Sequence, residues 1–270
     1  PHPAGTEIVL LNSAPAPFPG QAGVGVIPNV MKFRVTAAPG HTAAVPASLR
    51  AFTPLSEAAA TVNREFHLEK GPADACSPYH WRIASIVNGA PVGHMWHEMT
   101  EFPQLGTTEI WKFVNLSGVT HPMHVHLVMF QVLDRQAFEV VNGAILPLGS
   151  PVPPPPHEAG WKDTVQVGPN EIVRVIMRFV NPLDASAPTY TGMFPYHCHI
   201  LEHEDHEMMR EFRVTCPGDF NSNCIVNAAD LSVLLSSFGT EVAPGRDGDG
   251  RAVFGQRFDA LEIGVPHERV

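Results

Sequence analysis

Short runs rich in Val, Ile and Phe recur along the chain, and Gly, Pro or Asn residues separate one run from the next. This spacing is typical of an all-β sandwich or barrel. The 27 prolines agree with it, because proline is frequent at sheet edges and turns and costly inside helices. No long amphipathic helix is expected before residue 215. Strands are expected at Glu7–Asn12, Val30–Thr36, Trp81–Val87, Thr108–Val114, His124–Asp134, Thr164–Val167 and Glu171–Phe179.

Composition divides the chain into five stretches. Residues 1–36 hold only two strand-like runs, too few to bury a core, so we interpret them as the closing strands of a truncated preceding domain. Residues 37–64, rich in Ala, Pro and Ser, predict an interdomain linker. Residues 65–215 form the main β domain, and 44% hydrophobic residues can supply its core. A loop with a helix is expected over 216–240, and an irregular tail over 241–270.

The charge balance excludes several classes of partner. With a net charge of −10 and 17 Lys plus Arg, the chain lacks the clustered cations that nucleic acid or an anionic membrane surface requires. Its apolar stretches are far shorter than the roughly 20 residues that span a bilayer. No secretory leader opens the sequence. We therefore expect a globular protein with no nucleic-acid partner and no membrane span.

The histidines are concentrated in two windows, which hold seven of the 15. In a strand, alternate side chains point to opposite faces, so Cys198 points away from the histidines that flank it. The Cys198 thiolate with His121 and His203 makes the ligand set of a blue (type 1) copper centre, and Met208 can supply the weak axial thioether. The first window spans residues 121–126 and the second spans residues 197–206.

The histidines on the opposite face predict a second metal site. His197 and His199 share that face and can each hold a different copper, while His124 and His126 alternate in their own strand and can complete part of the same cluster. An electron accepted at the copper held by Cys198 would pass through the backbone into the two flanking histidines. The compound that donates the electron and the dioxygen that accepts it would then bind at separate sites and never need to meet.

Two motifs carry a resemblance to a known family. The runs His121-Pro-Met-His-Val-His126 and His197-Cys-His-Ile-Leu-Glu-His203 resemble the third domain of multicopper oxidases, and in particular the bacterial spore-coat laccase and bilirubin oxidase subgroup. Gly106-Thr-Thr-Glu-Ile-Trp111 and Pro153-Pro-Pro-Pro-His-Glu-Ala-Gly-Trp-Lys-Asp-Thr164 look similar to the same subgroup. The resemblance spans roughly residues 5 to 215 by motif. It implies a cupredoxin-like Greek-key β-sandwich.

The resemblance also implies a role for each motif residue. Glu204 matches an acidic position that feeds protons toward dioxygen, whose reduction to water consumes them. A complete trinuclear cluster needs further histidines that the family carries in its first domain, and this chain has no third His-x-His pair. The missing cupredoxin domains would lie either in the same polypeptide (in cis) or in a partner chain (in trans). The implied ligands are His121, Cys198, His203 and Met208 for type 1 copper, His124 for type 2, and His126, His197 and His199 for the type 3 pair.

A separate pattern follows the main domain. Oxygen-bearing side chains recur in an order that resembles an EF-hand calcium loop and the loop–helix half of a dockerin repeat. Cys224 occupies the sixth place, where Gly is usual, and only a degenerate second repeat occurs around Asp247 to Asp259. The alternative is an Asn/Asp-rich turn that caps a helix. The expected calcium ligands are Asp219, Asn221, Asn223, Ile225, Asn227 and Asp230.

The remaining cysteines indicate the cellular compartment in which the protein works. Cys216 and Cys224 bracket this turn and predict a disulfide in an oxidising compartment, while Cys76 is assigned no role. Together with the family resemblance, this favours a periplasmic, cell-surface or secreted setting.

The leading functional hypothesis is a laccase-type oxidoreductase. It would oxidise a phenolic or pigment-like small-molecule donor at type 1 copper and reduce dioxygen to water at the trinuclear cluster. One alternative is a type 1 copper electron-transfer or copper-binding fragment without oxidase activity, which would hold one copper per chain in place of about four. Another is a calcium-dependent surface attachment module. A nitrite reductase ranks low, because it does not need both His-x-His pairs.

Overall fold

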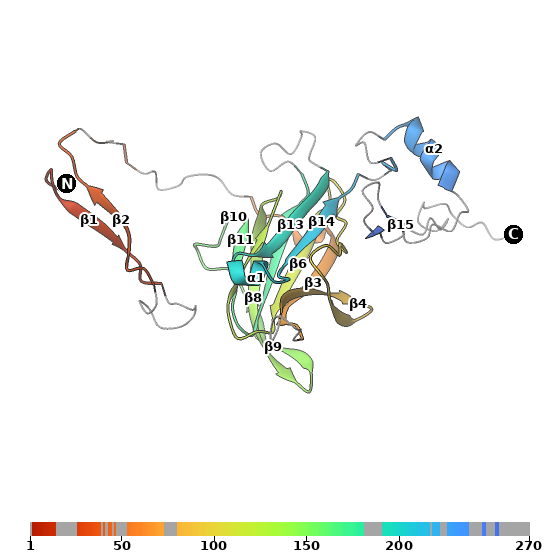
Figure 1. The fold of residues 1–270 in the computed structure, drawn as a ribbon, viewed down its shortest axis with the longest axis horizontal. Coiled ribbons are helices and arrows are strands. Elements are labelled where there is room, and N and C mark those ends of the chain that lie inside the picture. The colour runs from red at the N-terminus through yellow and green to blue at the C-terminus, as the bar shows by residue number, and fades with distance from the viewer. Residues whose placement is uncertain are drawn as a thin grey trace.

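The computed structural model describes residues 2–14, 26–38, 40, 43–44, 46, 53–72, 80–180, 191–216, 218–221, 226–237, 245–246 and 252–253. Strands dominate this part of the chain, as the recurring apolar runs predict. The helices are a short 3-10 turn η1 (Glu57–Ala59), a single turn α1 (Leu201–Glu204) and the longer α2 (Ala228–Ser237). Figure 1 shows the strands between residues 60 and 214 gathered into one central body.

The larger of the two main sheets has eight strands in the order β10-β8-β12-β6-β3-β4-β5, with β9 paired to β8. Strands β3 and β6 run parallel, and the other neighbours are antiparallel. The strands are β3 (Ala60–Lys70), β4 (Trp81–Val87), β5 (Ala90–Gly93), β6 (Thr108–Asn115), β8 (Phe130–Val141), β9 (Ala144–Val152), β10 (Trp161–Lys162) and β12 (Glu171–Arg178).

The smaller sheet carries both histidine windows. Its order is β11-β7-β13-β14, and its strands are β7 (His121–Val125), β11 (Thr164–Val167), β13 (Gly192–Cys198) and β14 (Met209–Val214). Burial alternates along β7 and β14, so one face of this sheet packs against the larger sheet and the other face is more open. Figure 1 shows β13 and β14 lying across β6 and β3. The architecture is a two-sheet sandwich.

Aromatic side chains from both sheets fill the space between them. The Trp111 ring lies 5.0 Å from the Phe66 ring, 5.1 Å from the Tyr196 ring and 5.7 Å from the Phe212 ring, measured between centroids. All four side chains are buried. Edge-to-face and tilted pairs of this kind contribute about 0.5–1.5 kcal/mol each beyond the area they bury. This cluster fixes β13, and with it Cys198, relative to the larger sheet.

Two of the strand predictions need correction. The single strand predicted over His124–Asp134 is wrong, because β7 ends at Val125 and β8 begins at Phe130 in the other sheet. Leu127 adopts a φ of 69° between them, a left-handed conformation that ends an extended run. Strands β3, β5, β9, β10 and β14 are absent from the predicted runs, and β3 starts at Ala60, inside the range expected to be linker.

The two ends of the chain add small elements. Strands β1 (Glu7–Leu11) and β2 (Asn29–Arg34) pair as an antiparallel ribbon with both faces exposed. Strands β15 (Gly245–Arg246) and β16 (Ala252–Val253) form a second short ribbon, whereas most of the predicted second calcium repeat lies outside the described residues. Among the described residues, no helix has the length and apolar character needed to cross a bilayer.

Candidate metal centre

Three ligand atoms meet between the two sheets. The Sγ atom of Cys198, at the end of β13, lies 3.7 Å from Nδ1 of His121 on β7 and 3.7 Å from Nδ1 of His203 on α1. The two Nδ1 atoms are 3.1 Å apart, and all three side chains are buried. One thiol and two imidazole nitrogens facing a common point form the donor set that copper accepts. We call these three residues the thiol site.

The backbone brings Met208 to the same place. The Cys198 amide donates a hydrogen bond to the Met208 carbonyl (3.0 Å), and the Met208 amide donates to the His203 carbonyl (3.1 Å). The single turn of α1 therefore folds the chain back, so that the backbone of Met208 lies beside the backbone of Cys198. Met208 is fully buried there.

Burial sets the protonation of the thiol site. It raises the pKa of the Cys198 thiol to about 12 and lowers the pKa of His203 to about 4. It also lowers the pKa of His121 to about 3, and the neighbouring His203 adds to that effect. Without a metal ion, all three groups are therefore neutral at pH 7. The imidazoles have lone pairs ready to bind, but the thiol has to lose its proton first.

Binding of one equivalent of Cu²⁺ at pH 7 is expected to release about one proton per chain. The Cys198 pKa lies above this pH and the pKa values of His121 and His203 lie below it, so only the thiol contributes. Between about pH 5 and 9 the apparent affinity should then rise roughly tenfold per pH unit. Calorimetry in buffers of different ionisation enthalpy measures the proton count. Release of two or more protons at pH 7 would contradict the neutral imidazoles.

A buried chain of hydrogen bonds orients the His121 ring. Its Nε2 atom lies 2.6 Å from Oγ of Ser117, and that hydroxyl lies 2.8 Å from Oδ1 of Asn115. The Asn115 amide nitrogen donates to the carbonyls of Val119 and Val167, which leaves Oδ1 as the acceptor. The Ser117 hydroxyl then donates to Asn115 and accepts from the His121 Nε2–H. This tautomer leaves Nδ1 of His121 free to face the thiol.

Replacement of Ser117 by alanine should weaken copper binding at the thiol site by about 10–100-fold, the usual effect of losing a partner behind a ligating imidazole. Ser117→Thr keeps the hydroxyl and is expected to bind copper as the unaltered protein does. Competition with a coloured copper chelator measures the difference. Equal affinity in Ser117→Ala and Ser117→Thr would show that the hydroxyl does not orient the ring.

A second group of imidazoles lies on the other face of the smaller sheet. His197 on β13 is paired in register with His124 on β7, and its Nε2 atom lies 3.2 Å from Nε2 of His126. The His199 ring lies 5.0 Å from the His124 ring and 4.9 Å from the His197 ring. Alternation along β13 therefore separates these rings from Cys198, as the sequence predicts. We call these four residues the imidazole face.

The imidazole face is open on one side. His124 and His126 are half-buried and His199 is exposed, whereas His197 is buried. Partial burial lowers the pKa of His124 and of His126, so both rings are neutral at pH 7. The nitrogen atoms of His124, His126 and His197 are close enough to share one ion. The face supplies ligands from one side only.

Glu204 lies at the edge of the imidazole face. Its Oε1 atom is 3.9 Å from Nδ1 of His197, a nitrogen that also lies 3.2 Å from the carbonyl oxygen of Cys198. The Glu204 side chain is 24% exposed, so it contacts both solvent and the buried ring. A carboxylate in this position can exchange protons with water and pass them inward.

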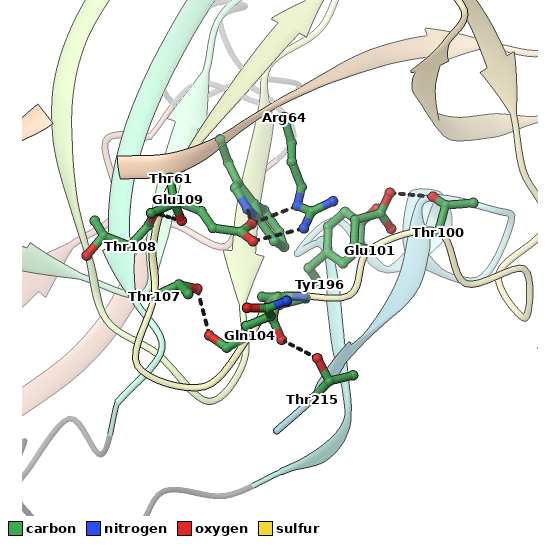
Figure 2. A network of polar contacts seen from close by, with 12 residues as sticks. Thr61, Arg64, Thr100, Glu101, Gln104, Thr107, Thr108, Glu109, Tyr196 and Thr215 are labelled. Atoms are coloured by element: carbon green, nitrogen blue, oxygen red, sulfur yellow. Dashed lines mark hydrogen bonds and ion pairs between the residues drawn. The ribbon is translucent and has the colours of Figure 1, made fainter. Parts of the chain in front are cut away.

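A buried network of charges supports the strand that carries Cys198 (Figure 2). The Tyr196 hydroxyl donates to Oε2 of Glu101 (2.9 Å), and Nη2 of Arg210 lies 3.3 Å from the same oxygen. Glu101 also accepts a short hydrogen bond from Thr100. This network was not predictable from sequence, because Glu101 lies in a loop far in sequence from Tyr196 and Arg210. Ser117 is only four residues before His121, but no motif marks that spacing. The effect of the network is to tie β13 and β14 to the loop before β6.

The described part of the predicted calcium loop is arranged as a capped turn. The Asp230 carboxylate accepts hydrogen bonds from the backbone amides of Phe220 (2.9 Å), Asn221 (3.2 Å) and Asn227 (2.7 Å). These bonds, that of Asn227 first, lower the pKa of the Asp230 carboxyl. The expected ligands Asn223 and Ile225 and the disulfide partner Cys224 lie outside the described residues, so calcium binding and the disulfide stay predictions.

A two-sheet sandwich with a buried Cys/His/His site beside a face of imidazoles defines a cupredoxin-like copper protein. The chain belongs to the multicopper oxidase family, whose sequence model matches residues 61–217. This membership confirms both the all-β cupredoxin-like fold and copper as the cofactor.

Two curated relatives are laccases. The laccase of Bacillus subtilis (strain 168) is 36% identical over 232 residues, which cover 79% of this chain and 39% of that protein. The laccase of Haloferax volcanii is 37% identical over 220 residues, which cover 79% of this chain and 33% of that protein. The chain thus spans between a third and two fifths of the length of these relatives.

A solved structure supports the same fold. The laccase of Pediococcus acidilactici Pa5930 is 27% identical to this chain and superposes on it with a TM-score of 0.51. The match covers 79% of this chain and 37% of the other.

Proposed function

We propose that this chain supplies the type 1 copper centre and half of the trinuclear copper centre of a laccase-like oxidase. The observation that carries the proposal is the position of Cys198 between His197 and His199. Its thiol belongs to the site between the sheets, while the two flanking rings belong to the imidazole face. A single tripeptide therefore joins both sites through covalent bonds.

Each residue then has a separate task. Cys198 holds the type 1 ion by its thiolate, and its peptide bonds form the shortest covalent connection to His197 and His199. When bound, the copper ions supply one-electron oxidation of the donor and reduction of dioxygen to water. Glu204 would hold and deliver protons beside His197. The proposed ligands are His121, Cys198, His203 and Met208 for type 1, His124 for type 2, and His126, His197 and His199 for type 3.

The open side of the imidazole face supports a further domain in the working oxidase. His199 is exposed and His124 and His126 are half-buried, so another set of imidazoles can approach the same ions. We propose that cupredoxin domains in cis or in trans supply them. A phenolic or pigment-like compound is the proposed donor, because both curated relatives named above are laccases. A periplasmic, surface or secreted setting and calcium-dependent attachment through Asp219–Asp230 also remain proposals.

Copper content, colour and oxygen uptake of the 270-residue chain test this function. The chain should bind one copper tightly and show the intense blue absorption of a copper thiolate. Oxygen uptake with a phenol should require the additional domains. Absence of the blue absorption at full copper loading would contradict the proposal. One copper per chain with no oxygen uptake in any context would favour the electron-transfer alternative.

Glu204→Gln tests the proton role within the complete oxidase. The substitution should slow oxygen reduction by about 100-fold, the lower end of what general acid catalysis contributes. Reduction of the type 1 centre by the donor should stay unchanged, because Glu204 is proposed to act only on the side of His197. Glu202→Gln is the matched control, since Glu202 is exposed in the same turn. Equal turnover in the two variants would exclude the role.

A further inference from the structure

Trp81 packs against both imidazoles of the thiol site. Its ring stacks on the His203 ring, with centroids 4.1 Å apart and an interplanar angle of 28°. The same indole lies edge-on to the His121 ring at 5.3 Å and 67°. These two histidines come from different elements, α1 and β7, and Trp81 comes from β4 of the other sheet. One side chain thus packs against both imidazole rings of the thiol site.

Backbone hydrogen bonds fix the position of Trp81. Trp81 is the first residue of β4, where it pairs in register with Lys70 of β3, and its carbonyl accepts a hydrogen bond from the Glu207 amide (2.9 Å). The indole is 6% exposed and the His203 ring is 8% exposed. Because the indole is stacked on His203, it occupies space through which water would otherwise reach that ring.

Exclusion of water has a defined consequence for a copper ion held by one thiolate and two neutral imidazoles. The cupric form of such a site carries a net charge of +1, and the cuprous form carries none. Apolar surroundings penalise the charged form more, so they favour the reduced state. The Lys70 ammonium, 4.8 Å from the centre of the Trp81 ring, adds positive charge that acts in the same direction.

We infer that Trp81 raises the reduction potential of the type 1 copper by covering His203 and fixing the planes of both imidazole ligands. Trp81 therefore helps to decide which donors the oxidase can oxidise, although it binds neither copper nor donor. This inference rests on the proposed function. It differs from a purely structural role, which would change the melting temperature and leave the potential unaltered.

The test is a redox titration of the blue absorption in the copper-loaded chain, with electron paramagnetic resonance of the same samples. In Trp81→Leu and Trp81→Ala, the redox equilibrium between the type 1 copper and a reference couple should shift about tenfold toward the cupric form. This corresponds to a reduction potential lower by about 59 mV for one electron. Trp81→Phe keeps an aromatic ring over His203 and should shift it by less than half of that. Trp96→Ala is the control, because Trp96 is 43% exposed and its ring packs edge-on against His97, which is not a proposed copper ligand.

The outcomes separate this inference from the proposed function. Absence of blue absorption in the unaltered chain contradicts the type 1 assignment itself. If the blue absorption is present, the equilibrium constant between the type 1 copper of Trp81→Leu and the reference couple decides. A value within twofold of that of the unaltered chain overturns the role of Trp81. If Trp81→Ala fails to fold, the difference between Trp81→Leu and Trp81→Phe decides, and equal shifts in these two also overturn it.

Discussion

Copper-loaded Cys198→Ser protein is expected to be colourless, because the blue absorption arises from the copper–thiolate bond and a serine hydroxyl does not ionise at neutral pH. Affinity at the thiol site should fall by more than the 10–100-fold that loss of an outer partner causes, since a ligand itself is removed. In the proposed complete oxidase, electrons from the donor should no longer reach the imidazole face. Optical titration with copper and oxygen uptake measure the two effects.

The control for this substitution is Cys216→Ser, a change outside both histidine groups. It should leave the blue absorption and the copper affinity unchanged. Circular dichroism of the metal-free forms should show that both variants keep the sandwich. A blue Cys198→Ser protein would place the thiolate on another cysteine and refute the assignment of the thiol site.

Replacing Glu109 by alanine should destabilise the sandwich by about 3 kcal/mol, because it leaves a largely buried guanidinium without its partner. Arg64 donates two hydrogen bonds to this carboxylate, at 2.7 and 2.8 Å (Figure 2). The Trp111 indole N–H donates a third at 2.8 Å. The Glu109 side chain is only 1% exposed. For a domain of this size the melting temperature should fall by roughly 6–12 °C.

Two further variants show whether burial is the cause. Glu57→Ala removes a carboxylate that also pairs with an arginine, Arg174, but the Glu57 side chain is 53% exposed. This change should cost less than about 1 kcal/mol. The double variant Arg64→Met with Glu109→Leu should recover much of the stability lost in Glu109→Ala, because it removes the stranded charge. Equal losses in Glu109→Ala and Glu57→Ala would contradict the argument.

The two substitutions act on different properties of the protein. Cys198→Ser removes a ligand while the aromatic cluster around Trp111 and Tyr196 still packs the two sheets. Glu109→Ala removes the acceptor of the Trp111 indole N–H and strands the Arg64 charge, so any loss of copper should follow the loss of folding. Measuring copper affinity and melting temperature on each variant separates these effects.

Sequence alone determined the fold class and the composition of the proposed metal sites. Period-two alternation assigns the Cys198 thiol and the rings beside it to opposite faces of a strand, and this needs no knowledge of the partner strands. The runs over Trp81–Val87 and Thr164–Val167 coincide with β4 and β11, because local apolar residues and flanking turns suffice to set such bounds. The nature of the ligands, one thiol and several imidazoles, already pointed to copper.

Only the tertiary structure decided what surrounds those ligands. The break at Leu127 depends on the passage of the chain from one sheet to the other. Strand β3 lacks a clear pattern because only Phe66, His67 and Leu68 are buried, while its first residues are largely exposed. Trp81 contacts the ligating rings from the other sheet, so no local spacing indicates it. Ser117 lies only four residues before His121, but its contact with the ring depends on how the turn between β6 and β7 folds. Alternation of side chains is a local property of the backbone, whereas the exclusion of water from the thiol site arises from contacts between segments distant in sequence.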